Sequence, residues 1–231
     1  MHTNDDISAY RKGFLKEKKY TTDMQAYLKR RVFDTYHNLL IHRGLTGLSK
    51  GTRLLDLGSA DLSFVNVCKE NGLDVSGLDI HDNVNFESDS FPIESQTIDV
   101  VTATSVIEHL YSPSNFMSEI WRVLKPGSAF ILVCPNWKYS YKNYFNDPTH
   151  VHPYTKVSLS RLFKSFNFEK EYIVPWLVKK PVWMWDIPKA FFIAKWIIPF
   201  RGDAPKWIPK FLKGSSSSIL AMAIKPDLKD K

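Results

Sequence analysis

Residues 53–62 read RLLDLGSADL, and this stretch decides the fold class. Arg53 to Leu57 is a short apolar run of the kind that forms a buried strand. Gly58 then permits a tight turn, and residues 63–71 continue in helical rhythm until Gly72. The stretch therefore predicts a strand, a turn and a helix in direct succession.

The same alternation continues along the chain. Further strands are expected at 75–79, 83–87, 98–104, 129–134, 171–177 and 217–225, and helices at 23–45, 114–124 and 156–166. Strands that alternate with helices favour a parallel sheet covered by helices on both faces. We expect one α/β domain over residues 1–231, with an N-terminal helical extension over 1–48.

Composition limits where the protein works. With 231 residues, of which 44% are hydrophobic, the chain can bury a sizeable core. Its two cysteines, Cys68 and Cys134, lie in apolar stretches and have no metal-ligand spacing. The first 22 residues lack the apolar core of a signal peptide. These features predict a reducing, cytoplasmic setting.

The segment 178–214 differs in composition from the rest of the chain. It holds eight Lys or Arg against two Asp, and four of the seven tryptophans. It stands between the last two expected strands, so we interpret it as an insertion. Charged residues and prolines interrupt its apolar residues, so it lacks the run of about 20 apolar residues that a membrane-spanning helix needs.

The turn after the first strand is the expected ligand site, because ligands of open α/β sheets bind beyond the carboxyl ends of the strands. Gly58 lets a ligand approach the backbone, and Asp56 supplies an acceptor beside it. Asp79 ends the second strand, where a carboxylate can accept both hydroxyls of a ribose. The turn lacks the three glycines of a dinucleotide fingerprint, so a nucleoside without a pyrophosphate fits better.

Four stretches in this order resemble the motifs of class I S-adenosylmethionine-dependent methyltransferases, of the type 11-like kind. They are residues 54–60 (LLDLGSA), the loop and strand of 88–101, residues 105–110 (SVIEHL) and residues 123–128 (VLKPGS). The resemblance implies a Rossmann-like, doubly wound, mostly parallel sheet with an antiparallel last strand. It also implies S-adenosylmethionine as the cofactor.

By this resemblance the turn lies under the methionine part of the cofactor, Asp79 holds the ribose, Asp89 or Ser90 meets the adenine, and Ser105 lies near the sulfonium. The residues assigned to cofactor binding are Asp56, Gly58, Ser59, Ala60, Asp79, Ile80, Ser88, Asp89, Ser90 and Ser105. Ala60 and Leu62 depart from the family, which usually has glycine there. Leu62, the larger change, puts the approach of the cofactor in doubt.

The stretch 147–154 (DPTHVHPY) carries more side-chain chemistry than a plain connection needs. It resembles the D-x-T-H-V segment of methyltransferases found with sugar and polysaccharide biosynthesis genes. We expect His150 to be a general base that Asp147 orients. Packing of the loop by His150 is the alternative. A metal site of His150 and His152 lacks an identifiable third ligand, so no metal is expected.

Glu108 and His109 lie near the cofactor by the same resemblance. They are candidate catalytic residues, with a capped or salt-bridged helix start as the alternative. The insertion has three interpretations. It contacts a membrane surface or a lipid-linked acceptor at the inner face, it forms a lid over the acceptor, or its lysines bind RNA.

The favoured function is O-methylation of a small or lipid-linked acceptor, such as a sugar or an isoprenoid-type hydroxyl compound. The alternatives are a catalytically silent relative that binds a membrane or a partner, and an RNA methyltransferase. Nucleic acid is the less favoured partner, because no RNA-binding module accompanies the basic residues.

Overall fold

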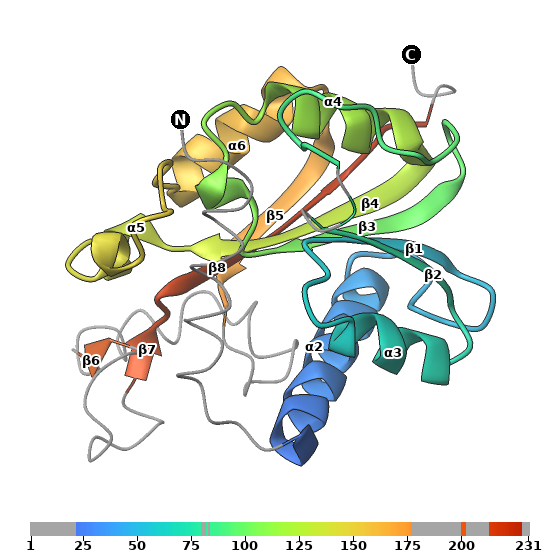
Figure 1. Cartoon of the computed structure of the whole chain (residues 1–231), viewed down its shortest axis with the longest axis horizontal. Coiled ribbons are helices and arrows are strands. Elements are labelled where there is room, and N and C mark those ends of the chain that lie inside the picture. The colour runs from blue at the N-terminus through green and yellow to red at the C-terminus, as the bar shows by residue number, and fades with distance from the viewer. Residues whose placement is uncertain (1–21, 80–81, 83, 177–199, 202–212, 228–231) are drawn as a thin grey trace.

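The computed structural model describes residues 22–79, 82, 84–176, 200–201 and 213–227. The strands of its main sheet are β1 (Arg53–Leu57), β2 (Asp74–Leu78), β3 (Ile98–Thr104), β4 (Leu124–Pro135), β5 (Glu169–Pro175) and β8 (Ser218–Ile224). Their order across the sheet is β2-β1-β3-β4-β8-β5 (Figure 1). β6 (Phe200–Arg201) and β7 (Lys213–Ser215) form a separate parallel pair.

The predicted sheet topology is confirmed. β1 pairs in parallel with β2 and with β3, and β3 pairs in parallel with β4. β8 is antiparallel to both of its neighbours, β4 and β5. The last strand of the chain therefore enters the sheet between two strands that run opposite to it. All the parallel strands end at one edge, which becomes the edge of the candidate site.

The main helices are α2 (Thr22–His42), α3 (Ser63–Glu70), α4 (Ser114–Val123) and α6 (Lys156–Ser165); shorter turns are η2 (Ile107–His109), α5 (Trp137–Ser140) and η3 (Tyr144–Asn146). Figure 1 shows α2 and α3 on one face of the sheet and α4 and α6 on the other. None of the described helices is both long and apolar enough to cross a membrane.

Each face of the sheet has its own hydrophobic core. Tyr36 and Phe64 from α2 and α3 pack on the face that carries Leu54 of β1. Phe116 and Phe163 from α4 and α6 pack on the opposite face. Alternate residues of the central strands point to opposite sides, which is why both faces of these strands must be apolar. Both cysteines are free and buried within these layers.

Three expectations about strands need correction. Residues 84–87 form a turn rather than part of a short strand, while Asn83 lies outside the described residues. β4 starts at Leu124, five residues earlier than expected, because its pairing with β3 contains a register shift between Ile98 and Val100. β5 starts at Glu169 and ends at Pro175. The segment 178–214 lies outside the described residues except for β6 and β7, so its proposed roles remain predictions.

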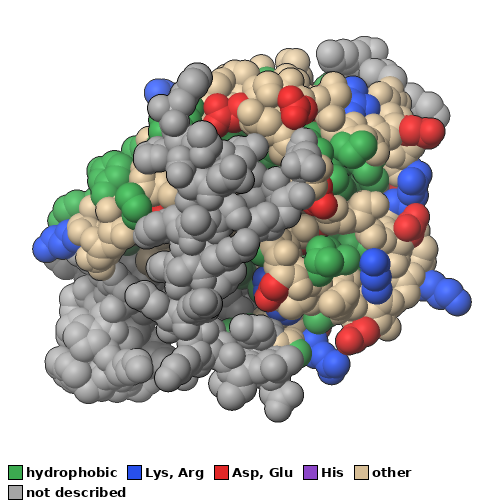
Figure 2. Space-filling view, in the orientation of Figure 1, with side chains coloured by type: hydrophobic (Ala, Val, Ile, Leu, Met, Phe, Trp, Pro, Cys, Tyr) green, Lys and Arg blue, Asp and Glu red, His purple; other side chains and the backbone are tan. Residues whose placement is uncertain are grey.

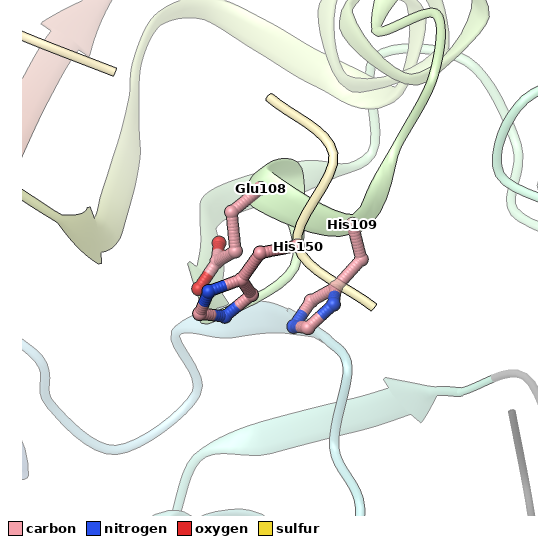
Figure 3. Close-up of side chains that lie close together, drawn as sticks. All are labelled: Glu108, His109 and His150. Atoms are coloured by element: carbon pink, nitrogen blue, oxygen red, sulfur yellow. The ribbon is translucent and has the colours of Figure 1, made fainter. Parts of the chain in front are cut away.

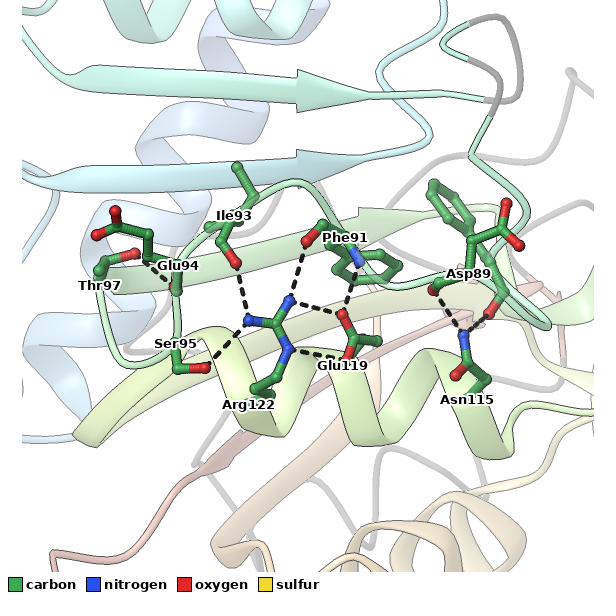
Figure 4. A network of polar contacts seen from close by, with 10 residues as sticks. Asp89, Phe91, Ile93, Glu94, Ser95, Thr97, Asn115, Glu119 and Arg122 are labelled. Atoms are coloured by element: carbon green, nitrogen blue, oxygen red, sulfur yellow. Dashed lines mark hydrogen bonds and ion pairs between the residues drawn. The ribbon is translucent and has the colours of Figure 1, made fainter.

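A partly buried ion pair fixes the loop before β3 onto α4 (Figure 4). Glu119 accepts the backbone N–H of Phe91 at 2.6 Å and pairs with Arg122 at 2.7 Å. Arg122 also donates to the carbonyl oxygens of Phe91 and Ile93, at 3.0 and 2.8 Å. The hydrogen bonds from Arg122 hold the pKa of Glu119 below its usual value. One helix thus holds the whole connection between β2 and β3.

Charge on the described residues is balanced. They contain eighteen Lys and Arg and eighteen Asp and Glu, so the excess of +7 belongs to residues outside them. Figure 2 shows acidic and basic side chains interspersed over the described part of one face. The described part of that face therefore does not form a continuous basic surface of the kind that nucleic-acid binding needs.

Replacing Glu119 with Gln tests the ion pair. We expect Glu119→Gln to lower the free energy of unfolding by about 2 kcal/mol, because a charged hydrogen-bond acceptor is lost at a buried position. Urea denaturation followed by circular dichroism measures the change. Glu70→Gln is the matched control, since its pair with Arg30 is 59% and 66% exposed, and it costs less than about 1 kcal/mol. Equal losses in the two variants would contradict the assignment.

Candidate functional site

The turn after β1 requires a glycine at position 58. Gly58 has φ +76°, and a Cβ atom there would lie 2.4 Å from Cγ2 of Val106. Its N–H donates to the carbonyl oxygen of Leu78 at the end of β2. The turn is thereby clamped between β2 and the segment that follows β3. A side chain at this position would push the two segments apart.

Ala60 and Leu62 keep the backbone shape of the glycines that they replace. Their φ angles are +47° and +58°, both in the left-handed region. The Leu62 side chain is 47% exposed and directly precedes α3. The larger residue therefore leaves the conformation of the turn intact and lies partly in solvent. Its cost is backbone strain of about 1–2 kcal/mol.

Asp79 stands against the same turn. Its carboxylate is buried and accepts the N–H of Ala60 at 3.0 Å, and its own N–H donates to Asp82. Ser59, also buried, packs close to Gly77 of β2. Ile80 lies outside the described residues. The carboxylate predicted to hold a ribose is thus at the carboxyl end of β2, directly beside the glycine turn.

Asp56 lies inside the sheet, on the face that α2 covers. It is 6% exposed and accepts a hydrogen bond of 2.7 Å from the hydroxyl of Thr102. Burial raises its pKa from 3.8 to about 6, and the Thr102 bond opposes part of that rise. Tyr36 of α2 bonds Thr104 next to it at 3.0 Å. Asp56 therefore belongs to a buried polar row beneath the turn.

Asp89 holds its own loop together. Its carboxylate accepts from the N–H of Asn85 and from the Ser88 hydroxyl, which lowers its pKa. Asn115 of α4 donates to the Asp89 carbonyl at 2.9 Å (Figure 4). Ser88 and Ser90 are exposed. The described contacts of the Asp89 carboxylate are within the loop, so this carboxylate shapes the predicted adenine loop.

Ser105 directly follows β3 in a strained backbone conformation. It is exposed, has φ +56°, and donates its N–H to the carbonyl oxygen of Val133 in β4. Its neighbour Val106 is the residue that fills the space left by Gly58. Strain of this kind persists where the surrounding structure over-determines it, often at functional sites.

Beyond Val106, three candidate catalytic residues come together (Figure 3). Glu108 and His109 lie on η2, and His150 comes from the loop after β4. One potential ligand atom from each lies within 4.8 Å of the others. Glu108 is 1% exposed. The three residues that the sequence proposed separately therefore form one cluster.

The His109 ring is held by Thr149. Its Nδ1 lies 3.1 Å from the Thr149 carbonyl and 2.9 Å from the Thr149 hydroxyl. That hydroxyl donates to Asp147 at 2.6 Å, so toward His109 it can only accept. Nδ1 of His109 therefore carries the proton in this arrangement. A neutral ring in this tautomer carries its lone pair on Nε2.

His150 is oriented by a different group than expected. Its Nδ1 lies 2.7 Å from the backbone carbonyl of Tyr144, which can only accept, so Nδ1 again carries the proton. Asp147 lies 3.8 Å from Nε2 of His150. The ring packs between those of Tyr144 and His109, with centroids 4.6 and 4.9 Å away. The Tyr144 carbonyl, rather than Asp147, therefore fixes the ring.

The loop that carries His150 is anchored on Glu108. The N–H groups of Val151 and His152 both donate to the Glu108 carbonyl, at 2.9 and 3.1 Å. His152 itself is exposed and stacks on Tyr154. Its side chain is not a member of the cluster. Backbone hydrogen bonds between segments far apart in sequence thus bring His150 to η2.

An apolar cavity of about 570 Å³ opens at the same edge of the sheet. Its lining comes from the start of α5 and α6 and from the ends of β5 and β8, and includes Trp137, Val157 and Ile173. The Trp137 ring contacts Tyr144 at 5.2 Å, and Tyr144 contacts His150. A second cavity of about 380 Å³ lies at the opposite edge, beside Gly51 and Gly127.

Sequence reasoning missed Tyr144 and Thr149, which set the protonated nitrogens of the two histidines. Thr149 had a local signal, since Asp147 two residues earlier is well placed for a side-chain turn. Tyr144 acts through its carbonyl, which no side-chain pattern reveals. The apolar cavity was also missed, because its lining residues are scattered over four elements.

Comparisons with known sequences place the chain in a family. The family model described as a methyltransferase domain matches residues 24–173. A probable S-adenosylmethionine-dependent methyltransferase of Mycolicibacterium smegmatis is 32% identical over 83 residues, which cover 35% of this chain and 32% of that protein. An uncharacterised protein of Mycobacterium tuberculosis is 33% identical over 57 residues, covering 25% of this chain and 20% of its own length. The chain thus spans a third or less of these curated relatives.

Solved structures share the fold. An S-adenosylmethionine-dependent methyltransferase from Archaeoglobus fulgidus aligns with a TM-score of 0.63 at 19% identity, covering 94% of this chain and 100% of that one. A phosphoethanolamine N-methyltransferase of Haemonchus contortus in complex with S-adenosyl-L-methionine aligns with a TM-score of 0.52 at 16% identity, covering 93% and 60%. At these identities the similarity concerns the fold alone.

Gly58→Ala tests the clamp on the turn. We expect it to lower the free energy of unfolding by about 1–3 kcal/mol more than Gly51→Ala, through the clash with Val106. Gly51 is the matched control, because its φ is +85° and nothing lies within 4 Å of an added Cβ. Calorimetric titration with S-adenosylmethionine should show weaker binding for Gly58→Ala alone. Val106→Ala in the Gly58→Ala background should recover part of the loss; additive losses would contradict the clamp.

Asp56→Asn tests the buried carboxyl group. Because the folded pKa of Asp56 is about 6 against 3.8, the folded state keeps a proton that the unfolded chain releases between those values. Wild-type stability therefore falls as pH rises through this window, and the loss is complete above about pH 6. Asp56→Asn should be more stable than wild type by about 2–3 kcal/mol at neutral pH and equal to it at low pH. Urea denaturation across pH measures this.

Asp74→Asn, at the exposed start of β2, is the control for this series. It should change the free energy of unfolding by less than about 1 kcal/mol at every pH. A difference between Asp56→Asn and wild type that stays constant with pH would refute the raised pKa.

Proposed function

The chain belongs to the methyltransferase domain family, and we propose that it transfers a methyl group from S-adenosylmethionine to a hydroxyl oxygen of a small or lipid-linked acceptor. The observation that carries this proposal is the cluster of Glu108, His109 and His150 beside the glycine turn. The lipid-linked acceptor, with a sugar as its methylated part, is the form that we favour.

The cofactor side is supported by the fit of the turn. Gly58 allows the close contact with Val106, and Ala60 and Leu62 both have left-handed backbone in the same turn. Asp79 places a buried carboxylate directly against this turn. S-adenosylmethionine, named in the description of the Mycolicibacterium relative, supplies the methyl group when bound. We assign Asp79 to binding of the ribose. We assign Ser88, Asp89 and Ser90 to the loop around the adenine, and Ser105 to the edge of the site that faces the methyl group.

Methyl transfer to a hydroxyl differs from transfer to an amine in one respect. A hydroxyl must lose its proton, so a base is needed at the site. In the cation-free protein, Nε2 of His150 is the base, because the Tyr144 carbonyl holds the proton of the ring on Nδ1. The hydroxyl proton passes to Nε2, while the oxygen forms the new bond to the methyl carbon.

The acceptor side is supported by the apolar cavity. Trp137 lines the cavity, and the Tyr144 ring joins it to His150 through contacts of 5.2 and 4.6 Å. Lys138 and Lys156 also line it, which suits an acceptor with an apolar chain and an anionic group. A polyprenyl phosphate linked to a sugar has this chemistry. Contact with the inner face of a membrane through 178–214 would deliver such a molecule.

The alternatives have less support. The silent relative depended on Leu62, whose side chain is partly exposed while its backbone keeps the shape of glycine. The RNA methyltransferase depended on the lysines from Lys179 to Lys213, of which only Lys213 belongs to the described residues, and no RNA-binding module accompanies them in the sequence. The structural neighbours include an N-methyltransferase, but that similarity concerns the fold.

His150→Gln tests the assignment of the base. With a polyprenyl-phosphate-linked sugar in detergent micelles as acceptor, we expect kcat to fall by roughly 10²–10⁴-fold, the usual contribution of general base catalysis. Affinity for S-adenosylmethionine, measured by calorimetry, should stay unchanged. His152→Gln is the matched control, because its side chain is exposed and outside the cluster. Formation of S-adenosylhomocysteine and of the methylated acceptor measures turnover.

The same sugar without its lipid should be a poorer acceptor if the apolar cavity contributes to binding. Turnover of His150→Gln at the wild-type rate would contradict the role of His150. Wild-type protein that binds S-adenosylmethionine but methylates neither form of the sugar would contradict this acceptor class.

A further inference from the structure

We propose that Glu108, His109 and His150 form a binding site for a divalent transition cation, with Zn²⁺ the best match to the donor set. Two imidazole nitrogens and one carboxylate oxygen lie within 4.8 Å of one another (Figure 3). Two histidines and a glutamate are a known ligand set of catalytic zinc, which leaves one position open. This ligand set differs from the His150 and His152 pair considered from the sequence, for which no third ligand could be identified.

The spacing of the donors suits a small cation. Tetrahedral zinc with bonds of about 2.1 Å separates its ligand atoms by about 3.4 Å. Donor atoms that start within 4.8 Å reach this separation by small rotations of their side chains. Glu108 and His109 are adjacent on η2, and His150 is tied to the same turn through the bonds to the Glu108 carbonyl. The three residues therefore move as one unit.

The Nδ1 contacts of both histidines leave Nε2 as the atom that would bind a cation. A ligating imidazole typically donates its other N–H to a carbonyl or a carboxylate, which fixes the ring and leaves a lone pair for the metal. His150 does so through the Tyr144 carbonyl, at 2.7 Å. His109 does so through Thr149, at 2.9 and 3.1 Å. Neither ring needs to change its tautomer to bind a cation.

The surroundings of His109 extend this arrangement. The Thr149 hydroxyl donates a hydrogen bond to Asp147, which also accepts the Thr149 N–H at 3.0 Å. A carboxylate behind a histidine raises the basicity of the ligand and is typical of metal sites. Packing of the loop alone does not require this chain of hydrogen bonds from His109 through Thr149 to Asp147.

Burial gives the cation a further role. Glu108 is 1% exposed, so a cation held by Glu108, His109 and His150 would be largely shielded from bulk water. Its open position would face the acceptor hydroxyl, and zinc lowers the pKa of a bound oxygen ligand, to about 7 for water.

The catalytic role of the cation rests on the proposed function, whereas the binding of the cation does not depend on it. With a cation bound, His150 is a ligand rather than the base, and the acceptor hydroxyl releases its proton to water. Cation binding and methyl transfer can therefore fail separately, and the test measures them separately.

The test is calorimetric titration of ZnCl₂ into the full chain after removal of metals with a chelator. We expect one site per chain, and a visible spectrum typical of four-coordinate Co²⁺ when CoCl₂ replaces zinc. Glu108→Gln, His109→Gln and His150→Gln should each lower zinc affinity by more than roughly 100-fold. Thr149→Val, which removes only the support of His109, should lower it by roughly 10-fold.

His152→Gln is the matched control and should bind zinc as wild type does, because its ring is exposed and outside the cluster. Binding of S-adenosylmethionine, measured in every variant, shows that the fold is intact. Absence of zinc binding by the wild-type chain, or equal affinity in His109→Gln, His150→Gln and His152→Gln, would overturn the site. Zinc binding without methylation of the lipid-linked sugar would instead count against the proposed function and leave the site standing.

Discussion

The close approach of Val106 to Gly58 is the constraint on which the rest of the site depends. A Cβ atom on Gly58 would lie 2.4 Å from Val106, so the turn after β1 and the segment after β3 can touch only because that atom is missing. This contact places Ser105 beside the cofactor turn and η2 directly behind it. Cofactor and acceptor chemistry are thereby fixed relative to each other by one packing contact between two loops.

The cofactor half of the site could be predicted from sequence because its determinants are local. Strand, turn and helix follow one another over residues 53–70, and Asp79 ends the next strand. The failures have physical causes. The strand expected at 83–87 does not form, since Asp89 accepts the Asn85 N–H and closes a turn. The start of β4 was misplaced because the Pro126-Gly127 pair is absorbed by a register shift.

The acceptor half could be predicted only as separate candidates. Glu108 and His109 are 41 or more residues from His150 in sequence, and what joins them is backbone hydrogen bonding to the Glu108 carbonyl. The chemistry of the two rings depends on the carbonyl of Tyr144 and on Thr149. A carbonyl has no residue type, so its direction cannot be recognised in a sequence. The residue types identify the candidate side chains, whereas the tertiary structure determines which ring nitrogen of each histidine carries the proton.

The order of the rings from the cavity to the cluster argues for an acceptor with two unlike ends. Trp137 borders apolar space, Tyr144 is buried between it and His150, and His109 follows with Glu108 at its side. Aromatic contacts therefore run from the apolar cavity to the polar cluster. Glu108 is 1% exposed, so the far end of this path offers polar groups that are out of contact with bulk water. The proposed acceptor, with an apolar chain and a hydroxyl-bearing head, would match the apolar cavity at one end and the polar cluster at the other.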